Sequence, residues 1–123
     1  MSADDVGKAF ITHYYGTRDT NPSALAGLYN AQSVLTFEGT KFEGAAAIVD
    51  KFSKLGPVAH NAPAMLIDIQ SGPGGQSLII FVVGHLKIGT DGNPLQFSQV
   101  FQLVATGPGN YYVHNEAFRL IYG

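Results

Sequence analysis

The chain has 123 residues, of which 46% are hydrophobic and 13% charged, and it contains no cysteine. This length fits a single domain over residues 1–123 with a sizeable core, and the lack of cysteine excludes disulfides and thiolate chemistry. A net charge of -2 offers no basic surface for nucleic acid. The longest apolar run, Leu78 to Val83, is too short to cross a membrane as a helix.

Three helices are predicted in the first half of the chain. Apolar side chains recur every four residues from Val6 to Tyr14, which indicates an amphipathic helix. Pro22 suits the first turn of a second helix over Ser23–Tyr29. After a strand over Gln32–Phe37, a short strand fragment leads into a third helix that begins near Gly44.

The second half is predicted to form strands separated by turns rich in glycine and proline. The four strands cover Ala64–Gln70, Ser77–Ile88, Leu95–Ala105 and Tyr111–Tyr122. Three turns between four long strands describe an antiparallel meander. Because the helices come first and the strands second, the predicted fold class is α+β, with the helices packed on one face of an antiparallel sheet.

The strands also predict that the second face of the sheet is covered. The segment Leu78–Val83 is apolar on both faces, and the helices can cover only one of them. On the neighbouring strand, Val100 belongs to a mixed, uncharged face that suits a protein contact better than open solvent. A second copy of the same sheet would cover this face. We therefore expect a homodimer that packs through Phe81 and Val100, and a well-packed monomer is the alternative.

Few residues point to catalysis or to a bound metal. None of the four histidines stands at metal-ligand spacing, so neither a metal nor another cofactor is expected. A proton-transfer enzyme would need a buried acid opposite a donor, and nothing in the spacing of the plausible residues requires them to meet. Those residues are Glu38, Asp68, Tyr14 and Tyr15.

The most informative segment is Leu35-Thr36-Phe37-Glu38-Gly39. A short apolar strand carries the carboxylate of Glu38 at its end, beside the aromatic ring of Phe37. Charge and apolar surface meet at this one place. The combination suits recognition of a partner that carries both a cation and an aromatic ring.

Several segments resemble one known family in order and spacing. They are Phe10-Ile11-x-His13-Tyr14-Tyr15, Leu35-Thr36-Phe37-Glu38, Gly44-x-x-x-Ile48-Val49, Phe97-Ser98-Gln99-Val100-Phe101 and Asn115-Glu116-Ala117-Phe118-Arg119-Leu120. Together they span almost the whole chain, which is similar to the nuclear transport factor 2 family. The members of that family are small carriers that import the GTPase Ran in its GDP form.

The resemblance implies a cone-like fold, in which three helices and a strongly curved antiparallel sheet enclose an apolar cavity, and it implies a homodimer rather than an enzyme. Ran-GDP would bind at the cavity mouth, where an aromatic side chain of Ran enters and acids pair with its basic residues. Weak contacts with the Phe-Gly repeats of nucleoporins are also implied. The expected location is the cytoplasm, the nucleus and the nuclear envelope at the pore.

The family's binding residues can be carried over one by one onto this sequence. The strand-end acid falls on Glu38, the cavity aromatic on Phe37 and the rim histidine on His60. The other cavity positions fall on Leu55, Val58, Leu95 and Phe118. The resemblance thus predicts that these seven residues contribute to the Ran-binding site.

Two positions depart from the family pattern. The acidic pair in the hairpin is half matched, because Asp91 occupies one place and Gly89 the other. The aromatic residue that the family uses for Phe-Gly repeats falls near Ala3, which has no ring. Two outcomes stay open: such repeats bind more weakly, or they bind other apolar surface around Val6. Two other functions stay open here: a cavity enzyme of the isomerase or dehydratase type, and a domain that binds apolar peptides.

Overall fold

The computed structural model describes residues 2–56, 58–61, 65–89, 93–107 and 109–121. The helical segments are α1 (Ala3–Thr20), the 3-10 helix η1 (Pro22–Leu28), α2 (Ala45–Lys54) and the short 3-10 helix η3 (Pro73–Gly75). The strands are β1 (Tyr29–Phe37), β2 (Thr40–Glu43), β3 (Val58–His60), β4 (Leu66–Ser71), β5 (Ser77–Ile88), β6 (Leu95–Gly107) and β7 (Asn110–Leu120). No helix among these residues is long and apolar enough to span a membrane.

Helix α1 begins where the sequence supplies a cap. The Ser2 hydroxyl accepts a hydrogen bond from the backbone N–H of Asp5 at 3.2 Å, and the Asp5 carboxylate accepts one from the N–H of Ser2 at 3.3 Å. This reciprocal pair is a capping box. The face of α1 that carries Ile11, Tyr14 and Tyr15 is buried, so the helix brings two tyrosines against the sheet.

The other two predicted helices are also present, with one change of type. The second is the 3-10 helix η1, which ends at Leu28, so that Tyr29 already belongs to β1. The third, α2, buries Ile48 and Phe52 on one face, as its apolar stripe predicts. α2 and η1 pack against each other and against β1, so these two helices cover β1.

Seven strands form one open sheet. Its order is β2-β1-β7-β6-β5-β3, and β4 pairs with the other part of the same edge of β5. All pairs are antiparallel except β1 and β7, which are parallel. The expectation of a purely antiparallel sheet is therefore wrong at this pair. A short hairpin would force two strands to run antiparallel. β1 and β7 are joined by most of the chain instead, so they can run parallel.

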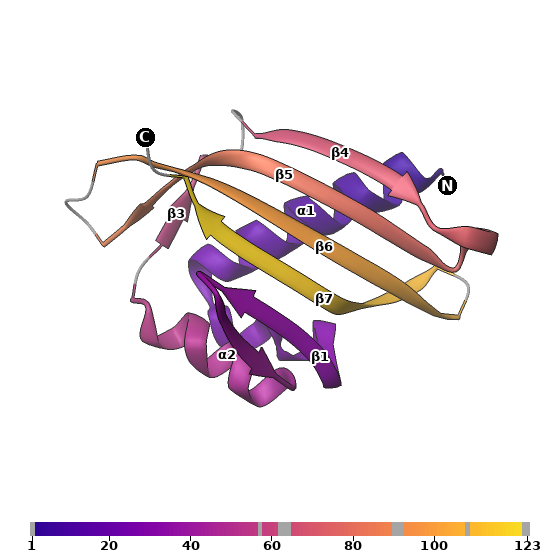
Figure 1. The fold of residues 1–123 in the computed structure, drawn as a ribbon, viewed down its shortest axis with the longest axis horizontal. Coiled ribbons are helices and arrows are strands. Elements are labelled where there is room, and N and C mark those ends of the chain that lie inside the picture. Colours follow the sequence, from indigo (N-terminus) through magenta and orange to yellow (C-terminus); the bar gives the residue numbers. More distant parts are fainter. Residues whose placement is uncertain (1, 57, 62–64, 90–92, 108, 122–123) are drawn as a thin grey trace.

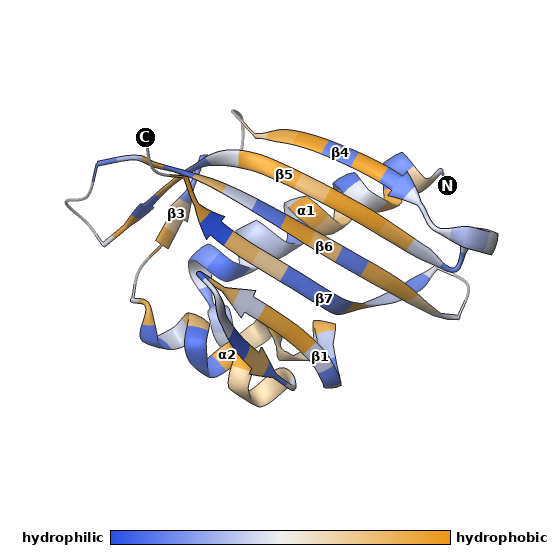
Figure 2. Ribbon diagram, in the orientation of Figure 1, coloured by the Kyte–Doolittle hydropathy of each residue, from blue (hydrophilic) through white to orange (hydrophobic). Residues whose placement is uncertain are grey.

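The two faces of the sheet differ in what covers them. Figure 1 shows α1 lying along one face of the curved sheet. Phe97, Phe101 and Leu103 of β6 point into the core on that side and are at most 1% exposed, as their alternation predicts. On the opposite face Ile79 and Phe81 are 45% and 43% exposed, and Figure 2 shows that β4 and β5 are mostly apolar.

Candidate partner-binding site

The ends of several strands meet at one end of the sheet. Glu38, directly after β1, donates its backbone N–H to the carbonyl of Phe118 on β7 at 3.0 Å. The start of β6 pairs with the last residues of both β7 and β5, and β3 pairs with the last residues of β5. Four of the predicted binding residues therefore come from this end: Glu38, Leu95, His60 and Phe118.

Glu38 occupies a tight turn that fixes its carboxylate. It has a φ of 51°, and Gly39 follows with a φ of 88°, so two residues reverse the chain between β1 and β2. A positive φ is uncommon for a residue other than glycine. The carboxylate of Glu38 accepts a hydrogen bond from the backbone N–H of Leu120 at 2.5 Å. The acid is thus held at the strand end and only partly buried.

A row of rings, which we call the aromatic row, runs beneath this end of the sheet. Phe37 stacks on Phe118 with ring centres 4.7 Å apart, and Phe118 stacks on Phe97 at 5.6 Å. The imidazole of His60 lies 5.4 Å from Phe97 and 4.4 Å from Tyr15. The row links β1, β7, β6, β3 and α1. Its phenylalanine rings are buried, and Phe37 directly precedes the turn that carries the acid.

His60 is held from two sides by Asp19 of α1. One carboxylate oxygen of Asp19 lies 2.6 Å from His60 Nδ1, and the other accepts the His60 backbone N–H at 2.7 Å. Burial lowers the pKa of the imidazole below its usual range, and the Asp19 carboxylate opposes this shift. The His60 side chain is fully buried, and among the described residues its Nε2 atom has no hydrogen-bond partner. The imidazole is therefore part of the wall and does not project from a rim.

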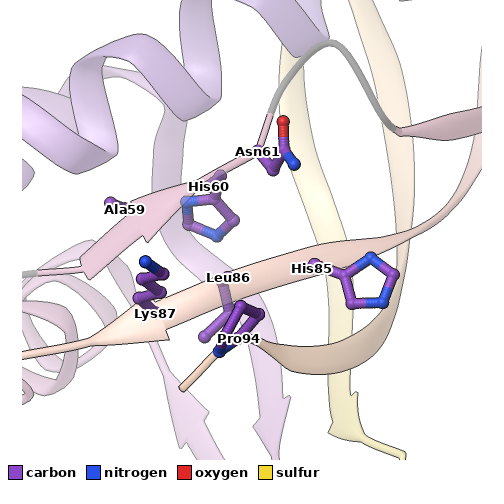
Figure 3. Close-up of a pocket in the computed structure, with 7 residues that line it drawn as sticks. All are labelled: Ala59, His60, Asn61, His85, Leu86, Lys87 and Pro94. Carbon is purple, nitrogen blue, oxygen red and sulfur yellow. The ribbon is translucent and has the colours of Figure 1, made fainter. Parts of the chain in front are cut away.

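A pocket of about 220 Å³ opens next to β3 and the end of β5. It is lined by Ala59, His60, Asn61, His85, Leu86, Lys87 and Pro94. Figure 3 shows Pro94 next to Leu86, with His85 and Asn61 toward the other end of the pocket. The walls are mostly apolar, with polar groups at the margin, which is the usual composition of a site that takes up a side chain or small ligand.

Comparisons with known proteins agree with this geometry. The family model for the nuclear transport factor 2 (NTF2) domain matches residues 6–120. Nuclear transport factor 2 of Oryza sativa subsp. japonica is 51% identical over 124 residues, with both chains covered completely. The chain belongs to the nuclear transport factor 2 family.

Two further members of the NTF2 family support the assignment. Nuclear transport factor 2B of Arabidopsis thaliana is 42% identical over 99% of this chain and 97% of its own. The solved structure of nuclear transport factor 2 from Cryptosporidium parvum has 45% identity and a TM-score of 0.86, covering 97% of this chain and 94% of its own. The predicted fold is confirmed. These relatives are transport factors and not enzymes, and their names support a role in nuclear transport.

The residues predicted from the NTF2 resemblance differ in how far they are exposed. Leu55 is half-buried just after α2, and Val58 is buried on β3. Leu95 is 39% exposed at the start of β6. Val6 is half-buried on α1. Asp91 lies outside the described residues.

Sequence reasoning missed a buried polar cluster, which we call the Glu116 network. The Glu116 carboxylate accepts hydrogen bonds from the hydroxyls of Tyr14 and Tyr29 and from the amide of Gln99, each at 2.5 Å. Tyr15 donates to Gln99 at 2.7 Å. Burial raises the pKa of Glu116, and the hydrogen bonds to it together with the charge of Arg18 oppose that shift.

The Glu116 network has the parts of a catalytic site but not its surroundings. Burial also raises the pKa of Tyr14 and of Tyr29 well above the usual range, so both stay protonated and act as donors. The pockets at the strand ends and around α1 are not lined by Glu116 or by either of these tyrosines. The hydrogen bonds to Glu116 come from α1, β1 and β6, so the network connects α1 and β1 to the sheet.

Proposed function

We propose that this protein is a nuclear import carrier that binds Ran-GDP at the strand-end site. The observation that carries the proposal is the turn after β1, where the Glu38 carboxylate is held by the N–H of Leu120 in front of the aromatic row. The nuclear transport factors among its relatives support the same role.

The proposed binding mode uses charge and apolar contact together. Glu38 pairs with a basic residue of Ran, and the neighbouring apolar pocket beside Leu86 and Pro94 takes up an aromatic side chain. Phe37 and Phe118 stack on each other and do not line this pocket, so a role for them in holding the ring requires the two to separate when it enters. Leu55, Val58, Leu95, His60 and Asp91 complete the proposed site.

The decisive experiment reverses the charge of Glu38. Because truncating or reversing one side of a partly buried charge pair costs about 2–5 kcal/mol of binding free energy, Glu38→Lys is expected to abolish measurable Ran-GDP binding in isothermal titration. Glu43→Lys makes the same charge change on the exposed strand β2 and serves as the control. It is expected to bind within a few-fold of the parent protein.

Circular dichroism must show that both variants keep the parent fold. Equal loss of binding in the two variants would mean that overall charge, and not the strand-end acid, governs the interaction. A Glu38→Lys protein that binds Ran-GDP as tightly as the parent would show that this site is wrongly assigned.

The carrier is further proposed to be a homodimer that binds Phe-Gly repeats of nucleoporins. The exposed apolar residues Ile79 and Phe81 favour a second sheet as the cover, and Val100 is the register partner of Phe81 on β6. Phe-Gly repeats would contact apolar surface around Val6. Such a carrier moves between the cytoplasm and the nucleus and is found at the pores of the nuclear envelope.

A further inference from the structure

A mostly apolar groove lies between α1 and the strands β3 and β4. It has a volume of about 340 Å³. Its lining combines aliphatic and aromatic side chains with a few polar groups: Ile11, Thr12, Tyr15, Gly16, Asp19, His60, Met65 and Ile67. The volume holds a molecule of about ten heavy atoms, since one water occupies about 30 Å³ in the liquid. The described part of the lining contains no lysine or arginine.

Gly16 keeps the middle of this groove open. It is an exposed residue of α1, and a Cβ atom added to it would have nothing within 4 Å. A larger side chain at this position would therefore extend into free space and not into neighbouring atoms. Thr12 and Asp19 stand seven residues apart on the same helix, which is about 10 Å along its axis. The groove is thus long enough for an extended molecule with a polar group at one end.

Asp19 brings a negative charge to one end of the groove, and its side chain is 22% exposed. One carboxylate oxygen accepts the His60 backbone N–H and the other lies 2.6 Å from His60 Nδ1. Because a carboxylate has about four acceptor positions, both oxygens can accept a further donor. Burial lowers the pKa of His60, so at pH 7 the neutral imidazole does not cancel the charge of Asp19. The guanidinium of Arg18 is buried and acts on the Glu116 carboxylate.

We infer that this groove binds a small organic amine with an apolar body, such as an arylalkylammonium ion. The ammonium group donates a charge-assisted hydrogen bond to the accessible part of the Asp19 carboxylate. The apolar body lies beside Gly16 and contacts Met65 and Ile67. Apolar walls with one charged group are the usual composition of a small-ligand site. The inference goes beyond the proposed carrier function, because His60 is the one described residue that lines both this groove and the pocket of about 220 Å³.

The test is a titration of the ¹⁵N-labelled protein with phenethylamine at pH 7 and constant ionic strength, followed by NMR. Phenethyl alcohol has nearly the same shape without the charge and is the matched control. The amine is expected to cause saturable shifts at the amides of Thr12, Gly16 and Ile67 and to bind about tenfold more tightly than the alcohol. Absence of saturable shifts at tens of millimolar amine, or equal affinity for the amine and the alcohol, would overturn the inference.

Substitutions on α1 test the shape of the groove and its charge separately. Gly16→Leu fills the groove and should abolish the binding of both compounds. Gly27→Leu should bind them as the parent does, since Gly27 on η1 also has nothing within 4 Å of an added Cβ and does not line the groove. Asp19→Asn should lower the affinity for the amine to that for the alcohol. Amine binding that survives Gly16→Leu, or that stays as tight in Asp19→Asn as in the parent, would contradict the assigned site.

One more variant separates this inference from the carrier proposal. Glu38→Lys should bind phenethylamine as tightly as the parent, because Glu38 does not line the groove. A loss of amine binding in this variant would place the amine at the strand-end site and overturn the inference. If Asp19→Asn does not fold, Gly16→Leu and the comparison of amine with alcohol in the parent protein decide.

Discussion

Glu116 shows how one residue can tie together elements that are far apart in the chain. Its two oxygens receive hydrogen bonds from α1, β1 and β6. A buried carboxylate is costly unless its acceptor positions are filled, and here three donors fill them. Removing a single donor therefore leaves part of the charge without compensation, which costs more than losing a bond between neutral groups.

This reasoning predicts unequal effects of the same change at two adjacent tyrosines. Tyr14→Phe removes a bond to the Glu116 carboxylate and should lower the free energy of unfolding by about 1.5–3 kcal/mol. Tyr15→Phe removes a bond to the neutral amide of Gln99 and should cost about 1 kcal/mol. Urea denaturation at pH 7 measures both. If Tyr15→Phe proves the more damaging, the carboxylate does not anchor the network.

At the scale of elements, a glycine allows α1 to pack closely against β4. A Cβ atom added at Gly7 of α1 would lie 2.6 Å from Cδ1 and 2.9 Å from Cγ1 of Ile69 on β4. Such distances are shorter than van der Waals contact, so the helix can lie this near to β4 only because Gly7 has no side chain. Gly16, on the same helix, has nothing within 4 Å of its virtual Cβ.

Two alanine substitutions in α1 should therefore act in opposite directions. Gly16→Ala gains helix propensity and should stabilise the protein by about 0.5–1 kcal/mol. Gly7→Ala makes the same gain but overpacks the contact with Ile69, which costs about 1–3 kcal/mol, so it should be destabilising overall. Thermal unfolding compares the two.

The contact itself is tested by a double-mutant cycle. Ile69→Val removes the nearest carbon atom and should cost less in the Gly7→Ala background than in the parent. Independent effects of the two changes would mean that the helix shifts away from β4 without strain.

A helix or strand could be predicted when the residues within it and next to it show its type and its ends. The bounds of β5, Ser77–Ile88, are the predicted ones, because glycine-rich turns enclose a long apolar run. The strand β3 was missed, since three residues after Pro57 are too few to show a period. The parallel pairing of β1 with β7 leaves no local trace, because a strand's pattern reports burial and not the direction of its neighbour.

The positions of site residues could be predicted where they follow from the end or the face of one helix or strand. Glu38 lies at a strand end, as expected. The inward orientation of Glu116 was overlooked, although the register of β7 is regular from Asn115 to Leu120. Counting back by two from Phe118, which is a good core residue, would have placed Glu116 on the buried face. The pairing of His60 with Asp19 could not be foreseen, because 41 residues separate them.

At the scale of the whole molecule, the outer face of the sheet remains to be accounted for. Ile79 and Phe81 on β5 are nearly half exposed, and Leu66 on β4 is 70% exposed. Val100 on β6 stands opposite Phe81 in register. An apolar surface of this kind on one layer of a two-layer fold favours a further layer, and a second copy supplies it with two-fold symmetry.

Lysine at the centre of this face should separate the proposed dimer without unfolding it. Phe81→Lys is expected to sediment at 13.1 kDa, whereas the parent sediments at twice that mass at micromolar concentration. Ile121→Lys makes a similar change at an equally exposed residue, 43%, beyond the end of β7 and should remain a dimer. A parent protein that is already monomeric, or a dimeric Phe81→Lys protein, would refute the sheet-to-sheet arrangement.

The long reach of the Glu116 network also bears on how the nascent chain matures. Tyr14 and Glu116 are 102 residues apart, and β1 cannot pair with β7 until that strand has left the ribosome. Contacts between such distant segments slow folding. Until β7 has been synthesised, α1 has neither the acid that Tyr14 binds nor the complete sheet that covers its apolar face. During that time α1 is an exposed amphipathic helix, which is the kind of segment that chaperones shield.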